Sequence, residues 1–161
     1  GFVIWKIISY KEKSFNQVEL KSTNVILNTT DMKYMDTIVS VGMDLLNINS
    51  TILVIRNLES TYKPSAMEGY DLKAYIKSNG IQYVIWVSDL NRISAIETLS
   101  HELIHMRQYY EGKLIVNQDG VQWNGKMFDT INVNYEKYPW EIEAFNEQYN
   151  LSKKIKEILY N

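Results

Sequence analysis

The chain has no cysteine among its 161 residues. Disulfide bridges and thiolate metal ligands are therefore excluded, although the lack of cysteine does not identify the compartment. Long apolar runs are missing as well, and no stretch approaches the roughly 20 residues that a membrane-spanning helix needs. A metal site in this chain must do without thiolate.

Charge of one sign is not in excess either. Lys and Arg number 17 against 19 Asp and Glu, which gives a formal charge of −2, and the basic residues are scattered. This balance gives no support for a nucleic acid or a strongly anionic membrane as partner. With 45% hydrophobic residues the chain can bury one core, so we expect a single domain over residues 1–161. Gly1 in place of methionine suggests a removed tag or leader, so the localisation stays unknown: cytoplasmic, or exported if a leader was removed before Gly1.

The two histidines of the chain lie in one short motif. Residues 101–105 are His-Glu-Leu-Ile-His. On a helix, positions i and i+4 share a face, so His101 and His105 can reach one metal ion while Glu102 stands beside it as a base. Ordinary residue frequencies give this pattern by chance in well under about 1% of chains of this length. The alternative is a half-buried helix whose histidines make only polar contacts.

A helix around the motif is predicted from its surroundings. Ser94 and Glu97 have the spacing of a capping box, and Gly112 is a typical stop, so we expect a helix over residues 93–110. An apolar stripe at spacings of three and four would face the core, with the histidines beside it; its members are Ile96, Leu99, Leu103 and Met106.

A catalytic zinc ion normally takes three protein ligands. The metzincin extension of the motif would need glycine at position 108 and histidine at position 111, whereas this chain has Gln108 and Glu111. With no further histidine, the third ligand is predicted to be a carboxylate. The most suggestive segment is 138–145, where Pro139 suits the first turn of a helix that continues to residue 159.

Two carboxylates compete there, and residues two apart on a helix point nearly opposite ways. Glu141 shares its helical row with Ala144, Leu151 and Ile155, so that row should face the core. Glu143 lies on a polar row. We therefore prefer Glu141 as the third ligand, with Glu143 as the alternative; otherwise Glu143 is a solvated surface charge or a group behind the ligands.

The motif at 101–105, followed on a second helix by Glu141-x-x-Ala144, resembles the gluzincin branch of the zincin zinc metallopeptidases. The resemblance covers roughly the second half of the chain. It implies zinc-dependent hydrolysis of peptide bonds, with one zinc ion per chain, a zinc-bound water activated by Glu102, and Glu141 as third ligand. It also implies that an edge strand, here residues 81–87, pairs with a peptide or protein substrate.

The chain departs from that family in two places. Some gluzincins have an aspartate at the position of Phe145 that orients a zinc histidine, so this contact must come from another residue or be absent. The additional histidine that some members use on the oxyanion is also missing, and three tyrosines are possible substitutes: Tyr109, Tyr135 and Tyr138.

The sequence leaves open the function, the identity of the metal and the oligomeric state. A noncatalytic metal-binding or protein-interaction domain with a zincin fold is the alternative function, although Glu102 would have no use in a purely structural site. Two imidazoles and a carboxylate suit zinc better than calcium or magnesium, and metal affinity should fall below about pH 6. The oligomeric state is not indicated.

The order of elements predicts an α+β fold: a small, mostly antiparallel or mixed sheet with helices on one side, and the metal between the helices 93–110 and 139–159. Residues 120–129, around Asn124-Gly125, are predicted to form a hairpin that walls the cleft or is purely structural. The remaining predicted elements are strands at 2–9, 23–28, 51–57 and 81–87 and helices at 31–46 and 65–77.

Overall fold

The fold is α+β, as the sequence predicts. The computed structural model describes residues 25–27, 33–56, 73–88 and 90–160, so the predicted strand at 2–9 lies outside the described residues. The elements in chain order are β1 (Val25–Leu27), α1 (Lys33–Leu45), β2 (Ile52–Arg56), β3 (Ala74–Ser78), β4 (Tyr83–Val87), α2 (Arg92–Tyr110), β5 (Leu114–Asn117), β6 (Gly120–Trp123), β7 (Lys126–Phe128), the short 3-10 helix η3 (Tyr135–Lys137) and α3 (Pro139–Tyr160).

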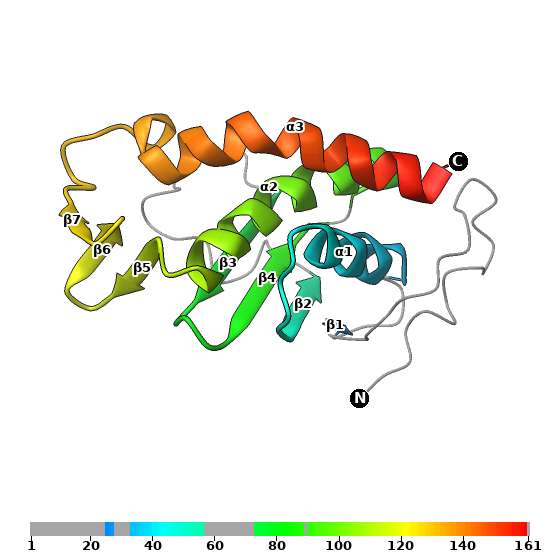
Figure 1. The fold of residues 1–161 in the computed structure, drawn as a ribbon, viewed down its shortest axis with the longest axis horizontal. Coiled ribbons are helices and arrows are strands. Elements are labelled where there is room, and N and C mark those ends of the chain that lie inside the picture. Colours follow the sequence, from blue (N-terminus) through cyan, green and yellow to red (C-terminus); the bar gives the residue numbers. More distant parts are fainter. Residues whose placement is uncertain (1–24, 28–32, 57–72, 89, 161) are drawn as a thin grey trace.

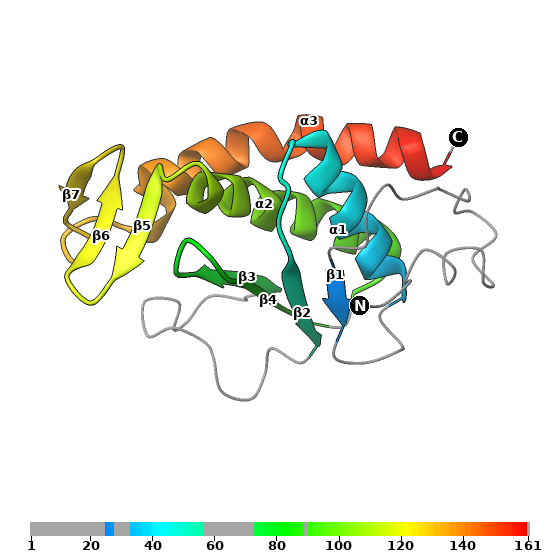
Figure 2. The same ribbon diagram turned by 60° about the horizontal axis from the view of Figure 1, so that its bottom comes forward.

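The first sheet is mixed and has the strand order β1-β2-β4-β3. β1, β2 and β4 are parallel, and β3 runs antiparallel to β4. The helices α1, α2 and α3 lie on one side of this sheet. α3 packs on both α2 and α1, on their sides that face away from the strands (Figures 1 and 2). Among the described residues, none of the helices combines the length and apolar character needed to cross a membrane.

The helix that carries the motif is held tightly in this arrangement. Asn91 caps its start by accepting a hydrogen bond from the Ser94 N–H, at 2.9 Å, and Gly112 follows its end with a φ of 75°. The predicted stripe residues are fully buried: Ile96, Leu99, Leu103 and Met106. α1 crosses so closely that a Cβ added at Gly42 would lie 2.4 Å from the Leu103 Cδ1. Such close packing fixes the position of α2.

The second sheet is an antiparallel meander of β5, β6 and β7. The predicted hairpin is present as β6 and β7, joined by Asn124 and Gly125, which have φ values of 52° and 81°, as a type I′ turn requires. The sheet covers a group of side chains that we call the aromatic cluster. Its members are Leu114, Tyr138 and Trp140, with the partly buried Tyr109, Val121, Trp123, Phe128, Val133 and Tyr135 packed against them.

The helix predicted at 65–77 is wrong where it can be checked, because residues 74–77 belong to β3; residues 65–72 lie outside the described part. The burial of β3 alternates, with Ala74, Ile76 and Ser78 buried and Lys77 exposed. Backbone pairing with β4 stabilises this extended conformation, and five residues are too few for a helical pattern to be distinguished from it. The turn at Asn79-Gly80 is the sequence signal that could have identified the strand.

The expected role of residues 81–87 as an edge strand is also wrong. The strand within this segment is β4, which lies between β2 and β3. Its backbone N–H and C=O groups already pair with those two strands. Within the described strands, β3 is at that edge of the sheet instead.

Candidate metal centre

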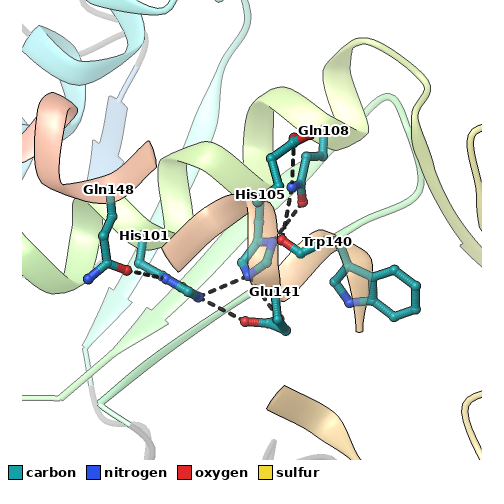
Figure 3. A network of polar contacts seen from close by, with 7 residues as sticks. His101, His105, Gln108, Trp140, Glu141 and Gln148 are labelled. Carbon is teal, nitrogen blue, oxygen red and sulfur yellow. Dashed lines mark hydrogen bonds and ion pairs between the residues drawn. The ribbon is translucent and has the colours of Figure 1, made fainter. Parts of the chain in front are cut away.

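The structure brings together the three residues that the sequence singles out as metal ligands. His101 and His105 project from α2, and Glu141 projects from the first turn of α3 (Figure 3). The two Nε2 atoms are 3.1 Å apart, and each lies 2.9 Å from one carboxylate oxygen of Glu141. Glu141 and His105 are buried, and the side chain of His101 is 12% exposed. Two nitrogens and a carboxylate therefore converge on one point.

This donor set suits a tetrahedrally coordinated metal ion. Ligand atoms about 2.0–2.1 Å from a zinc ion in tetrahedral geometry lie about 3.3 Å from one another. The observed separations of 2.9–3.1 Å are close to this value. The three side chains can hold a metal ion in common and leave one position open.

Gln108 fixes which nitrogen of His105 carries its proton. The Gln108 Nε2 donates hydrogen bonds of 3.0 Å to the Trp140 carbonyl and to the Glu143 carboxylate. Both partners are acceptors, so the amide orientation is determined and its Oε1 faces the His105 Nδ1, at 2.8 Å. Nδ1 must then carry the proton, and the neutral imidazole keeps the lone pair of Nε2 for a metal.

Gln148 has the corresponding role for His101. Its Oε1 lies 2.5 Å from the His101 Nδ1 (Figure 3). Phe145, which stands where some gluzincins have an orienting aspartate, packs its ring 4.7 Å from the imidazole centroid instead. The hydrogen bond that the aspartate would make therefore comes from a neutral amide. The sequence alone predicts no role for Gln108 or Gln148, although Gln148 lies seven residues after Glu141 on the same helical row.

Glu143 points away from the three ligand residues. Its carboxylate pairs with the Lys113 Nζ at 2.6 Å and accepts from Gln108 at 3.0 Å. Burial would raise the pKa of Glu143, but these hydrogen bonds and the charge of Lys113 lower it below its ordinary value. Of the two competing carboxylates, Glu141 faces the histidines, and Glu143 supports the glutamine behind them.

Glu102 is the motif residue that the ligand cluster does not use. It is 8% exposed, and burial raises its pKa to about 7, against the lowering effect of His105 and His101. A carboxylate with such a pKa can both accept and release a proton near neutral pH, as general acid–base catalysis requires.

The ligand residues themselves are strongly coupled in the absence of metal. Burial would lower the pKa of His105, but the hydrogen bond and charge of Glu141 raise it to about 9. Burial would raise the pKa of Glu141, but its hydrogen bonds to His101 and His105 lower it to about 2. At neutral pH an imidazole of ordinary pKa is mostly neutral, whereas His105 keeps its second proton. A metal ion must therefore displace this proton in order to bind His105.

A cavity of about 240 Å³ opens beside the ligands. Glu102, His105 and Glu141 line it, and its remaining walls come from β3, the aromatic cluster, Val116 and Thr130. The three tyrosines considered for the oxyanion also line it: Tyr109, Tyr135 and Tyr138. The Tyr138 hydroxyl donates to the Thr130 carbonyl, at 2.8 Å. Burial, followed by the charges around it, raises the pKa of Tyr109, so this phenol stays protonated at neutral pH.

No protein-family model, curated protein or solved structure matches the chain. The functional interpretation therefore depends on the residues and their geometry.

Proposed function

We propose that this protein is a zinc-dependent peptidase of the zincin type, with His101, His105 and Glu141 as metal ligands and Glu102 as general base. The observation that carries the proposal is the position of Glu102, a buried carboxylate that lines the same cavity as His105 and Glu141 and is not one of the three clustered ligand residues. A purely structural metal site needs no such group. Zinc is the metal that this donor set favours among the common divalent ions.

Bound zinc supplies Lewis acidity, which makes a water molecule more acidic and polarises a carbonyl group. The chain's own residues carry the proton. Glu102 takes it from the attacking water, whose oxygen bonds to the carbonyl carbon of the substrate. As the carbon–nitrogen bond breaks, the same carboxyl group delivers the proton to the departing nitrogen.

We propose β3 as the element that aligns the peptide. Among the described strands it forms the edge of the sheet nearest the centre, and Ala74, Tyr75 and Ile76 line the cavity. The Ile76 backbone also makes a hydrogen bond to Glu102. An extended peptide can pair with the free backbone groups of an edge strand, which would place its amide bonds beside Glu102.

The test is the substitution Glu102→Gln, assayed with zinc-loaded protein against a peptide library by mass spectrometry. We expect zinc content and fold to be kept while cleavage falls by at least about 100-fold, because the amide cannot take a proton. Glu97→Gln is the matched control, since Glu97 is exposed on the same helix and pairs with Lys156 at the surface.

Two results would count against the proposal in different ways. Cleavage that survives in Glu102→Gln would remove Glu102 from its role as base. A wild-type protein that holds one zinc ion and cleaves no peptide of the library would favour the noncatalytic metal-binding domain instead.

A further inference from the structure

We infer that a groove along α3 binds a small molecule that carries both a carboxylate and an ammonium group, such as a free amino acid. Glu97 of α2 forms one wall of this groove, and six residues between positions 148 and 157 of α3 form the rest of its described lining. The groove shares none of these residues with the cavity beside the metal centre, so the inference does not depend on the proposed function.

The size of the groove suits a small molecule. Its volume is about 450 Å³. Pockets that enclose such ligands usually measure about 300–1,000 Å³. The groove can therefore enclose an amino acid with a bulky side chain.

Two polar groups of the groove are available to a ligand. Ser152 lines the groove and is only 5% exposed, yet its hydroxyl makes no hydrogen bond within the described residues. Gln148 uses its amide oxygen on His101, and Figure 3 shows its amide nitrogen pointing away from that imidazole. Buried polar groups normally have partners, and the hydroxyl and the amide nitrogen can both donate to a carboxylate bound in the groove.

The charges around these donors favour a zwitterion. Lys156 and Glu97 pair with each other at 3.1 Å, whereas Lys153 and Glu157 pair with no described residue. Residues four apart on a helix are neighbours, so one small ligand can reach both Lys153 and Glu157. A multiply charged anion such as phosphate would instead face the carboxylates of Glu97 and Glu157 without an ammonium group to offset them.

Tyr149 indicates which kind of amino acid the groove favours. It lines the groove one helical turn before Lys153, and it is 70% exposed. An exposed ring offers its face to an aromatic or other apolar side chain. Phenylalanine therefore combines the three features that the groove can recognise: a carboxylate, an ammonium group and a ring.

Gln148 links the groove to the metal centre. Its Oε1 lies 2.5 Å from the His101 Nδ1, while its nitrogen is available to the ligand. A ligand that holds the nitrogen also holds the oxygen, because both belong to one planar amide group. Occupation of the groove should therefore be felt at the imidazole of His101.

The experiment is an NMR titration of the isotope-labelled full chain, as purified, with three probes. L-phenylalanine carries both charges, N-acetyl-L-phenylalanine lacks the ammonium group, and L-phenylalaninamide lacks the carboxylate. Phenylalanine should cause saturating shifts at the backbone amides of residues 149–157 and at the imidazole of His101. Phenylalaninamide should bind at least about 10-fold more weakly, because hydrogen bonds to a charged acceptor are lost. N-acetylphenylalanine should bind about 2- to 5-fold more weakly, because it loses an exposed ion pair.

Two adjacent lysines provide a matched pair of variants. Lys153 and Lys154 are both exposed on α3, and of the two only Lys153 lines the groove. Lys153→Met should weaken phenylalanine binding by about 2- to 5-fold, whereas Lys154→Met should leave it unchanged. Glu157→Gln should weaken phenylalanine binding by a similar factor and leave N-acetylphenylalanine binding unchanged, because that probe brings no ammonium group.

Three results would overturn the inference: no saturating shift in α3 with phenylalanine, equal binding of the three probes, or an equal loss of binding in Lys153→Met and Lys154→Met. Shifts confined to the residues that line the cavity beside the metal centre would also overturn it, because they would place the amino acid at the metal. Saturating shifts at residues 149–157 with none at His101 would overturn the link through Gln148. None of these results measures peptide cleavage, so the proposed function is judged separately.

Discussion

The two apolar clusters of the described residues differ in composition and in what they support. The cluster between the first sheet and the helices is mainly aliphatic, and most of its side chains are fully buried. The aromatic cluster under the second sheet is smaller, and most of its members are only partly buried. Close aliphatic packing fixes the positions of α2 and α3, and thereby the ligands, whereas the looser aromatic cluster borders the cavity. The aliphatic cluster therefore holds the helices that carry the candidate ligands, and the aromatic cluster forms much of the cavity wall.

α3 takes part in both clusters. Trp140 at its start packs in the aromatic cluster, and Leu151, Ile155 and Leu159 pack in the aliphatic one. Glu141 lies where the two meet. The comparison predicts that changes around the ligands alter metal affinity, and that changes on the second sheet leave metal affinity unchanged.

The largest effect is expected for Glu141→Ala. This substitution removes a ligand, so zinc affinity should fall by more than the roughly 10–100-fold that an outer hydrogen-bond partner contributes. Glu143→Ala should cost less than about 10-fold, because Glu143 acts only through Gln108. Isothermal titration of both variants with zinc checks the difference, and the reverse order would transfer the ligand role to Glu143.

One buried acidic residue of α1, beside the aliphatic cluster, should make the stability of the protein depend on pH. Asp36 is fully buried, its Oδ2 has no hydrogen-bond partner in the part of the chain that the structure describes, and burial raises its pKa from 3.8 to about 7. The native state therefore holds this proton more tightly than the unfolded chain. The contribution of Asp36 to the free energy of unfolding falls as pH rises from about 4 to about 7 and is level above that range.

Asp36→Asn removes this dependence, because the amide does not ionise. The variant should be more stable than wild type at pH 8, by about 2–4 kcal/mol, and similar to it at pH 4. Urea unfolding at the two pH values measures the change. Asp44→Asn, at an exposed position of the same helix, is the control and should show neither effect. A variant no more stable than wild type at pH 8 would contradict the pKa assigned to Asp36.

A smaller effect on zinc affinity is expected for Gln108, which links His105 to the backbone of Trp140. Gln108→Leu preserves bulk but leaves the His105 N–H and the Trp140 carbonyl without their partner, so zinc affinity should fall by roughly 10–100-fold. Gln148→Leu should cost less, because Gln148 is only half-buried and water can replace its carbonyl. Equal affinities in wild type and Gln108→Leu would show that the tautomer of His105 does not depend on this amide.

The sequence predicts the long elements well, because their signals are local and repeated. The helices α1, α2 and α3 follow apolar stripes, and the β6–β7 hairpin follows its Asn-Gly turn. The predicted helix at 65–77 misses β3, because five residues carry too little periodicity and the conformation of β3 depends on pairing with β4. The edge position could not be predicted either, since strand order depends on which strands meet in space.

The same reasoning applies to the candidate site. The motif and the helical row of Glu141 are visible in the sequence, and the structure places these residues together. Gln108 and Gln148 are neutral residues without a motif, and their roles arise from contacts that reach 32 and 47 residues along the chain. Such contacts exist only once α2 and α3 have packed.

The measurement that tests the central claim most directly is the zinc content of gently purified protein, compared between wild type and His105→Ala, with the fold of both checked by circular dichroism. We predict about one zinc ion per chain in wild type and none in the variant, because His105 supplies one of three ligands. A folded wild type that holds no zinc and takes none up when it is supplied, or a variant that keeps its zinc, would contradict the metal centre.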